Sequence, residues 1–176
     1  MRDLWIGVFE GYARACYEAC TVITTLYRDN QHLQLALGAE ARKLKVIANG
    51  IDVSRFQCLS CASQDERPTV ALIGRVVPIK DVKTFISAAA IIRQRIATLR
   101  VLVMGPTEED EAYFKECCQL VTELGLSDCV TFTGSVRITD LMPTIHVIVL
   151  TSLSEAQPLV LLEAGCIGLV LLGTHR

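Results

Sequence analysis

From Pro68 onward the sequence alternates between short apolar segments and longer amphipathic ones, and this alternation restricts the folds that the chain can adopt. Five segments carry the β-branched and aliphatic residues typical of buried strands, at 69–74, 99–105, 129–133, 146–150 and 169–172. Helical spacing fills the intervals, at 81–97, 108–124, 139–142 and from 158, and Asp81 is placed to cap the first helix. Strands that alternate with helices pack as a parallel sheet covered on both faces. We therefore predict an α/β fold, a Rossmann-like doubly wound parallel sheet, over residues 68–176.

The beginning of the chain predicts a smaller piece of the same class. Helix, strand, helix and strand are expected in turn, at 4–20, 21–25, 28–37 and 45–48. Two strands and two helices are too few to form a stable independent α/β domain. We interpret residues 1–53 as a short remnant of an N-terminal Rossmann-like domain with its hinge. Residues 54–67 are polar and lack periodicity, which predicts a linker at the domain boundary.

Composition narrows the class of protein. Hydrophobic residues make up 51% of the 176 residues and the mean hydropathy is +0.40, which indicates strands buried on both faces or a surface that meets a partner. The net charge is −2 and there is no basic tract, so we expect no nucleic-acid partner. The first residues lack the apolar core of a secretory signal, and no apolar run is long enough to cross a bilayer. These features favour a cytoplasmic protein.

Eight cysteines are scattered through apolar contexts, and without a secretory signal we expect most of them to be reduced core residues. Cys58 and Cys61 are the pair with metal or redox spacing. Cys16 and Cys20 share one face of a predicted helix and could complete a four-thiolate zinc site, which would suit an interaction protein. His146 opens an apolar strand, and we expect it to be a structural histidine.

Residues 151–163 hold the strongest candidate for a binding site. They follow the predicted strand at 146–150 as a polar loop, and Pro158 then begins a helix, because its missing N–H is not needed in a first turn. A helix N-terminus suits a phosphate group, and carboxylates such as Glu155 and Glu163 suit the hydroxyls of a sugar. The alternative is that both glutamates are simply solvated. Glu163 lies in an otherwise apolar turn, where a carboxylate needs a partner, and this favours a ligand.

Polar residues follow each of four predicted strands, at Gly74-Arg75, Gly105-Pro106, Gly134-Ser135 and 152–155. Parallel strands would bring these loops to one rim, where doubly wound sheets bind their ligands. Arg75 would then place a planar guanidinium group, and Lys80 an ammonium group on a flexible stem, beside the helix N-terminus. Two such cations suit a diphosphate. The alternative for Arg75 or Lys80 considered alone is a surface charge that only water solvates. The sequence carries no G-x-G-x-x-G, P-loop or G-x-S-x-G motif.

Two paired motifs, G-R-x-x-x-x-K from Gly74 and E-x-x-x-x-x-x-x-E from Glu155, resemble the donor-binding signature of glycosyltransferase family 4, the retaining enzymes of GT-B fold. Residues 49–52 are similar to the segment that joins the two Rossmann-like domains of that family. Within the family, residues 74–85 and 151–164 are most similar to the glycosyltransferases of bacterial Pel exopolysaccharide synthesis. The resemblance runs over nearly the whole chain.

This resemblance implies a role for each matching position. Arg75 and Lys80 would bind the donor diphosphate and stabilise the leaving nucleoside diphosphate. Glu155 would bind hydroxyls of the donor sugar, and Glu163 would bind the ribose. Arg75, Lys80 and Glu155 are thereby the candidate catalytic residues. The remaining candidate donor-binding residues, which would act near the base and the phosphates mainly through the backbone, are Gly74, Gly134, Val136, Pro158, Leu159 and Val160.

The resemblance also implies a UDP-sugar donor, no metal or other cofactor, and a polysaccharide acceptor bound by the full enzyme. Membrane-associated polysaccharide synthesis proteins would be partners on the cytoplasmic side of the inner membrane. Family members carry a complete N-terminal domain and closing C-terminal helices, and they usually have proline where Val170 stands here. We expect the chain to be the donor-binding part of a hexosyltransferase, with little activity alone. The alternative is a non-catalytic Rossmann-like module that binds a nucleotide or a protein.

Overall fold

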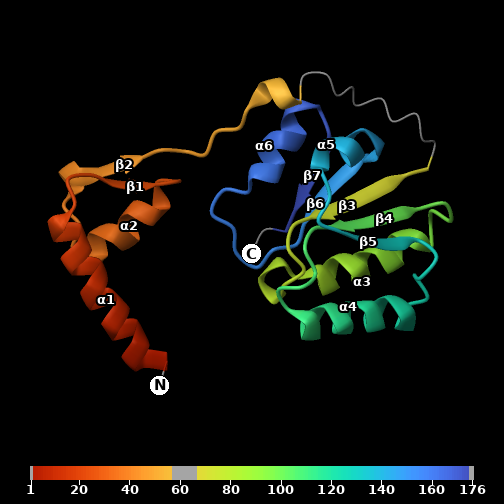
Figure 1. Ribbon diagram of the computed structural model, residues 1–176, viewed down its shortest axis with the longest axis horizontal. Helices are drawn as coiled ribbons and strands as arrows, with labels where there is room; N and C mark the ends of the chain where they lie inside the picture. Colours follow the sequence, from red (N-terminus) through yellow and green to blue (C-terminus); the bar gives the residue numbers. More distant parts are fainter. Residues whose placement is uncertain (1, 57–66, 175–176) are drawn as a thin grey trace. The chain divides into compact units, whose positions relative to one another are not determined.

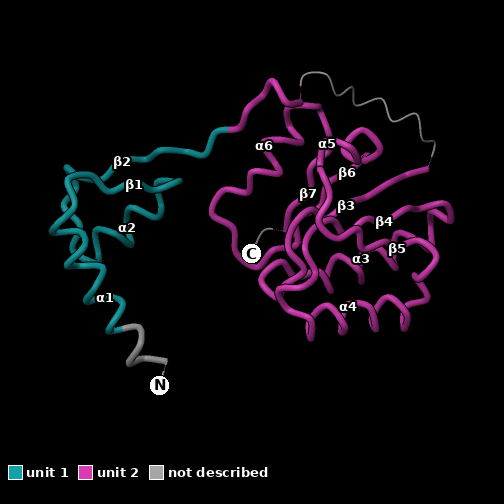
Figure 2. Tube along the Cα trace, in the orientation of Figure 1, with its two compact units in different colours: residues 1–50 teal, residues 51–176 magenta. Residues whose placement is uncertain are grey.

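The computed structural model describes residues 2–56 and 67–174. The chain forms two compact units, residues 1–50 and 51–176 (Figure 2). Most of the linker expected at 54–67 lies outside the described residues, as do Cys58, Cys61 and His175. The boundaries expected for the domains, and the zinc site that needs Cys58 and Cys61, therefore stay predictions.

In the first unit the expected order of helix, strand, helix and strand is confirmed. The elements are α1 (Arg2–Ala19), β1 (Ile23–Thr25), α2 (Asp29–Ala36) and β2 (Leu44–Val46), and the two strands pair in parallel. Lys43 donates hydrogen bonds of 3.0 Å to the carbonyls of Tyr17 and Glu18, where the negative end of the α1 dipole favours a cation. This contact fastens the end of α1 to the start of β2.

The second unit holds one sheet of five parallel strands in the order β5-β4-β3-β6-β7 (Figure 1). The chain builds outward from β3 through β4 to β5, returns to the other side of β3 at β6, and ends at β7. This order confirms the predicted doubly wound sheet and places its switch point between β3 and β6. The strands are β3 (Thr69–Ile73), β4 (Arg100–Met104), β5 (Val130–Gly134), β6 (Val147–Leu150) and β7 (Val170–Gly173). The helices are α3 (Val82–Arg93), α4 (Glu111–Glu123), α5 (Ile138–Leu141) and α6 (Leu159–Cys166).

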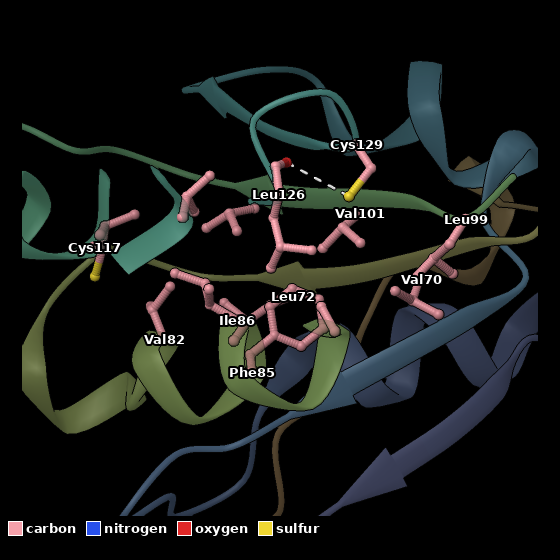
Figure 3. Close-up of a cluster of buried hydrophobic side chains, with 14 of the residues drawn as sticks. Val70, Leu72, Val82, Phe85, Ile86, Leu99, Val101, Cys117, Leu126 and Cys129 are labelled. Atoms are coloured by element: carbon pink, nitrogen blue, oxygen red, sulfur yellow. Dashed lines mark hydrogen bonds between the residues drawn. The ribbon is translucent and has the colours of Figure 1, made fainter. Parts of the chain in front are cut away.

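Helices cover both faces of this sheet, which explains the long apolar runs of its central strands. All five residues of β3 are buried. On one face α3 and α4 pack against β3 and β4, with Phe85 and Ile86 meeting Leu72 and Val101 in the cluster of Figure 3. On the other face α6 and the segment around Met142 bury the opposite sides of the same strands. Each fully buried aliphatic side chain contributes about 1.5–3 kcal/mol to stability.

Three local expectations are wrong. Asp81 precedes α3 as predicted, but its carboxylate accepts a hydrogen bond from the Thr84 hydroxyl (2.8 Å), not from a helix N–H. The second expectation concerns the start of α4. The Asp110 carboxylate caps this helix by accepting the backbone N–H of Tyr113 (2.9 Å), so α4 begins at Glu111, three residues later than expected. Every residue of the edge strand β7 is exposed, whereas the other edge strand, β5, is mostly half-buried.

The cysteines also depart from expectation. Of the six described cysteines only Cys117 and Cys129 are buried, whereas Cys16, Cys20 and Cys166 are exposed. Burial raises the pKa of the Cys117 thiol to about 11, so that thiol stays protonated and behaves as a small apolar group. The prediction that most cysteines belong to the core holds for the α4 and β5 region and fails elsewhere.

His146 makes a structural contact. Its Nδ1 accepts a hydrogen bond from the backbone N–H of Thr69 (3.1 Å), and the backbone N–H of His146 donates to the Thr69 carbonyl (2.9 Å). The imidazole thus joins the amino ends of β3 and β6, at the sheet edge away from the predicted rim.

Among residues 2–56 and 67–174, no helix combines the length and apolar character that a bilayer crossing requires.

Gly105 allows β3 and β4 to end side by side. Its backbone has φ +148°, and a Cβ there would fall well inside van der Waals contact with the carbonyl oxygen of Gly74. The two strand ends are tied by the N–H of Gly74, which donates to the Met104 carbonyl (2.8 Å). Only glycine fits this approach without moving one of the strands.

We expect Gly105→Ala to lower the free energy of unfolding by about 2–4 kcal/mol, because the new methyl group clashes with backbone that cannot rotate away. Urea denaturation followed by circular dichroism measures this loss. Gly165→Ala is the matched control, since its Cβ would meet nothing within 4 Å and alanine favours the helix that it joins. Equal stabilities for the two variants would contradict the steric argument.

Candidate functional site

The loops after β3, β4, β5 and β6 meet at the carboxyl edge of the sheet, and backbone hydrogen bonds join them. The N–H of Val76 donates to the Pro106 carbonyl (2.9 Å), and the N–H of Gly105 to the Gly134 carbonyl (3.0 Å). Across the switch point, the N–H of Leu153 donates to the Ile79 carbonyl (2.8 Å). Backbone hydrogen bonds therefore link the loops of this rim to one another. All the predicted site residues except Glu163 lie on these loops or at the start of α6.

Lys80 and Glu155 form an ion pair across the switch point. Their side chains are 19% and 25% exposed, and Ser152 donates a hydrogen bond of 2.8 Å to the same carboxylate oxygen. Burial acts to raise the pKa of Glu155, but the hydrogen bonds from Lys80 and Ser152 and the charges of Lys80 and Arg75 outweigh it and lower that pKa. Glu155 is thus a carboxylate at neutral pH, able to accept hydrogen bonds.

Gly74 lies against the side chain of Lys80. A Cβ at Gly74 would lie 3.5 Å from the Lys80 Cε, so the aliphatic stem of the lysine runs directly over this glycine. The stem therefore leaves the loop of residues 78–80 in one direction, toward β6. This contact places Gly74 beside the lysine that pairs with Glu155.

Arg75 points to a different acid. Its guanidinium pairs with Glu109 on the loop after β4 (2.7 Å), and the two side chains are 54% and 41% exposed. An exposed pair of this kind contributes little to stability, about 0–1 kcal/mol, so it can exchange partners readily. The two predicted cations are therefore not free in this structure, because each one is held by a carboxylate of the same rim.

The first turn of α6 lies next to Glu155. Pro158 occupies the position before the helix, and the N–H groups of Leu159 and Val160 follow in the turn where a helix offers them no carbonyl partner. The Val160 side chain is buried in the core, which fixes this turn. A hollow of about 410 Å³ opens here, lined by Ser152, Ser154, Glu155 and Pro158 among others.

Two further hollows lie along the rim, of about 260 Å³ and about 230 Å³. The first is lined by Arg75 together with apolar residues at the ends of β3 and β4. The second is lined by Glu163, and Val136 lines both, so the two adjoin. Gly134, with φ +64°, turns the chain out of β5 toward this boundary.

Glu163 lies apart from Glu155, and it is half-buried. Among the described residues it has no hydrogen-bond or ion-pair partner. A half-buried carboxylate without a partner favours a ligand that donates hydrogen bonds to it. Within the same described residues, no three His, Cys, Asp or Glu side chains are grouped so that they could hold a metal ion.

Residues 67–176 match the protein family described as Glycosyl transferases group 1. The chain belongs to this family. Residues 1–42 match a second family, described as a domain of unknown function (DUF3492). The group 1 match covers the sheet and every residue of the candidate site.

Curated relatives of this glycosyl transferase chain are longer proteins. It is 32% identical over 114 residues to the GDP-mannose-dependent alpha-(1-6)-phosphatidylinositol monomannoside mannosyltransferase of Mycobacterium tuberculosis, which covers 60% of the chain and 28% of the relative. It is 29% identical over 171 residues to the D-inositol 3-phosphate glycosyltransferase of Rhodococcus jostii, covering 90% of the chain and 38% of that protein. The chain thus spans about a third of the length of the relatives it matches.

Solved glycosyltransferase structures share the fold. Anabaena Alr3699/HepE in complex with UDP and glucose matches with a TM-score of 0.76 and 24% identity, over 92% of this chain and 47% of that one. A glycosyltransferase from Rickettsia africae matches with a TM-score of 0.81 and 17% identity, over 96% and 48%. These likenesses agree with the Rossmann-like sheet expected from the sequence.

We expect Glu155→Gln to lower the free energy of unfolding by about 1 kcal/mol near pH 7 and by almost nothing near pH 3. Because the folded-state pKa of Glu155 lies below its unfolded-state value, the contribution of this pair is present above the unfolded-state pKa. It is lost as the pH falls through the folded-state pKa. Urea denaturation of wild type and variant at both pH values measures it.

Glu116→Gln is the control for that experiment. Glu116 pairs with Lys83 but is 58% exposed, so we expect a smaller loss at neutral pH. A loss for Glu155→Gln that stays constant from neutral to acidic pH would contradict the charged pairing with Lys80.

Proposed function

We propose that this chain is the donor-binding part of a retaining glycosyltransferase of family 4 that transfers a hexose from a UDP-sugar to a growing exopolysaccharide. The observation that carries the proposal is the grouping of Lys80, Arg75 and the first turn of α6 at the switch point of the sheet. The similarity of residues 74–85 and 151–164 to the enzymes of Pel polysaccharide synthesis supports the acceptor class.

The two cations would act on the leaving group. When the bond between the anomeric carbon and the phosphate oxygen breaks, its electron pair stays on the nucleoside diphosphate. The acceptor hydroxyl forms the new glycosidic bond and passes its proton to an oxygen of the departing diphosphate. Lys80 and Arg75 would exchange Glu155 and Glu109 for phosphate oxygens and oppose the charge that develops. The N–H groups of the α6 first turn would bind the same phosphates.

Sugar and nucleoside would lie on opposite sides of the diphosphate. Glu155, in the hollow of about 410 Å³, would accept hydrogen bonds from hydroxyls of the donor sugar. Glu163 would accept hydrogen bonds from the ribose, and backbone groups from Gly134 to Val136 would meet the base beside the adjoining hollows. The Anabaena protein was solved with UDP-glucose bound, which supports a UDP-sugar.

In this proposal, the transfer of the sugar to its acceptor is carried out by the full-length enzyme, of which this chain is the donor-binding part. The acceptor site and the partners, a polysaccharide and membrane-associated synthesis proteins on the cytoplasmic side, would involve residues beyond 1–176. We therefore expect this chain to bind the donor without a metal ion or other cofactor, and to transfer little sugar alone, because transfer needs the acceptor held in line.

Calorimetric titration of the chain with UDP tests the proposal. We expect saturable binding that weakens at least about ten-fold in Arg75→Ala, since a charge-assisted hydrogen bond to phosphate is lost. GDP is titrated in parallel, because one curated relative is named for GDP-mannose.

Arg93→Ala provides the matched control. Arg93 also forms an exposed ion pair, with Asp128 (2.6 Å), but it lies at the end of α3, which points to the opposite edge of the sheet. We expect unchanged affinity in this variant. Equal affinity of Arg75→Ala and wild type would contradict the site, and no binding of either nucleotide by the folded chain would favour the non-catalytic alternative.

A further inference from the structure

Thr151, the residue directly after β6, makes an unusual pair of contacts. Its side chain is buried, with the residue only 3% exposed. The hydroxyl lies 3.0 Å from the Lys80 carbonyl and 2.9 Å from the Asp81 carbonyl, and its one proton is shared between them in a bifurcated hydrogen bond. A buried hydroxyl from one side of the switch point therefore holds two successive peptide groups on the other side.

The backbone held in this way is strained. Asp81 has φ 47° and ψ 49°, and within residues 2–56 and 67–174 it is the one residue other than glycine with a positive φ. Such a conformation persists only where the surroundings impose it. Here the surroundings are hydrogen bonds: Thr151 binds the Asp81 carbonyl, and the Thr84 hydroxyl binds the Asp81 carboxylate (2.8 Å).

This turn sets the direction in which Lys80 leaves the chain. The carbonyl of Ile79 accepts the N–H of Leu153, and the next two carbonyls accept the Thr151 hydroxyl. With three successive peptide groups fixed from the β6 side, the lysine stem runs over Gly74 and its ammonium group meets Glu155. Within residues 2–56 and 67–174, the Thr151 hydroxyl bonds only to those two backbone carbonyls and not to the Lys80 ammonium group or to Glu155, so its influence on them passes through the backbone.

We propose that Thr151 is a positioning residue, whose hydroxyl fixes the backbone at Lys80 and Asp81 and so aims the Lys80 ammonium group at the position between Glu155 and the start of α6. The aiming of Lys80 is a property of the chain alone. Its consequence for phosphate binding rests on the proposed function.

Substitution of Thr151 by valine or by serine distinguishes the effect of the hydroxyl group from the effect of side-chain size. Thr151→Val keeps the shape but removes the hydroxyl donor from the Lys80 and Asp81 carbonyls, of which the Asp81 carbonyl still accepts the backbone N–H of Thr84 (3.1 Å). Thr151→Ser keeps the donor and removes one methyl group. Thr69→Val is the matched control, because Thr69 is also fully buried and its hydroxyl donates to a backbone carbonyl, that of Arg67 (3.0 Å), at the opposite end of β3.

The first measurement needs no ligand. The carboxyl carbon of Glu155 is titrated by NMR in the full 176-residue chain. In wild type, Thr151→Ser and Thr69→Val, we expect the lowered pKa that Lys80 and Ser152 cause, and in Thr151→Val an upward shift toward the ordinary glutamate value. An unchanged Glu155 pKa in Thr151→Val would overturn the proposal, whether or not the chain binds a nucleotide.

The second measurement is the UDP affinity of the same variants. We expect Thr151→Val to bind roughly ten-fold more weakly than wild type, with Thr151→Ser within about two-fold. In a Lys80→Met background the same valine substitution should have no further effect, because its action passes through Lys80. A full additional loss in that background would overturn the proposal, since it would reveal a general structural role.

The two proposals fail in different ways. Absence of UDP binding by wild type together with the expected Glu155 shift would reject the proposed function and leave the positioning role supported. If Thr151→Val does not fold, Thr151→Ala and Thr151→Ser make the same comparison of chains with and without the hydroxyl. If Thr151→Ala also fails to fold, Thr151 serves the fold itself and the positioning role is rejected.

Discussion

The structure of the second unit depends on one constraint, that five strands run parallel while their order reverses at β3. Parallel strands point all their carboxyl ends to one edge, and the reversal separates the loops after β3 and β6 so that a ligand can enter between them. Lys80 comes from one loop and Glu155 from the other, and backbone hydrogen bonds join the loops. The candidate site is thus a consequence of topology, with chemistry added by a few side chains.

Much of this could be predicted from the sequence. Alternating apolar strands and amphipathic helices indicate the fold class, because burial on both faces leaves long apolar runs in the central strands, as in β3. The same pattern places Arg75, Lys80 and Glu155 after strands that end at one edge. The family match over residues 67–176 agrees with that prediction. The roles of these residues in donor binding stay predictions until binding is measured.

Other features could not be predicted, for physical reasons. The pairing of Arg75 with Glu109 joins residues 34 positions apart and depends on side-chain conformation, although the acidic run at 108–111 gave a signal that acids would lie on the rim. Asp81 takes the expected position before α3, but its backbone is left-handed and its carboxylate binds the Thr84 hydroxyl, while its carbonyl accepts the distant Thr151 hydroxyl. The exposure of β7 at the edge of the sheet is not encoded by its strand propensity.

The pairing of Lys80 and Arg75 with acids has a consequence for selectivity. A site whose positive charges are already neutralised creates little field at a distance, so it does not concentrate anions in general around itself. Affinity then arises only on contact, when an incoming molecule replaces both carboxylate partners at once. Inorganic phosphate can replace the partner of a cation, but it brings its own negative charge toward the released Glu155. Under the proposed function, a nucleotide-sugar would offer phosphate oxygens to the cations and hydroxyl donors to the carboxylate, so the resting pairs would favour the complete donor over its fragments.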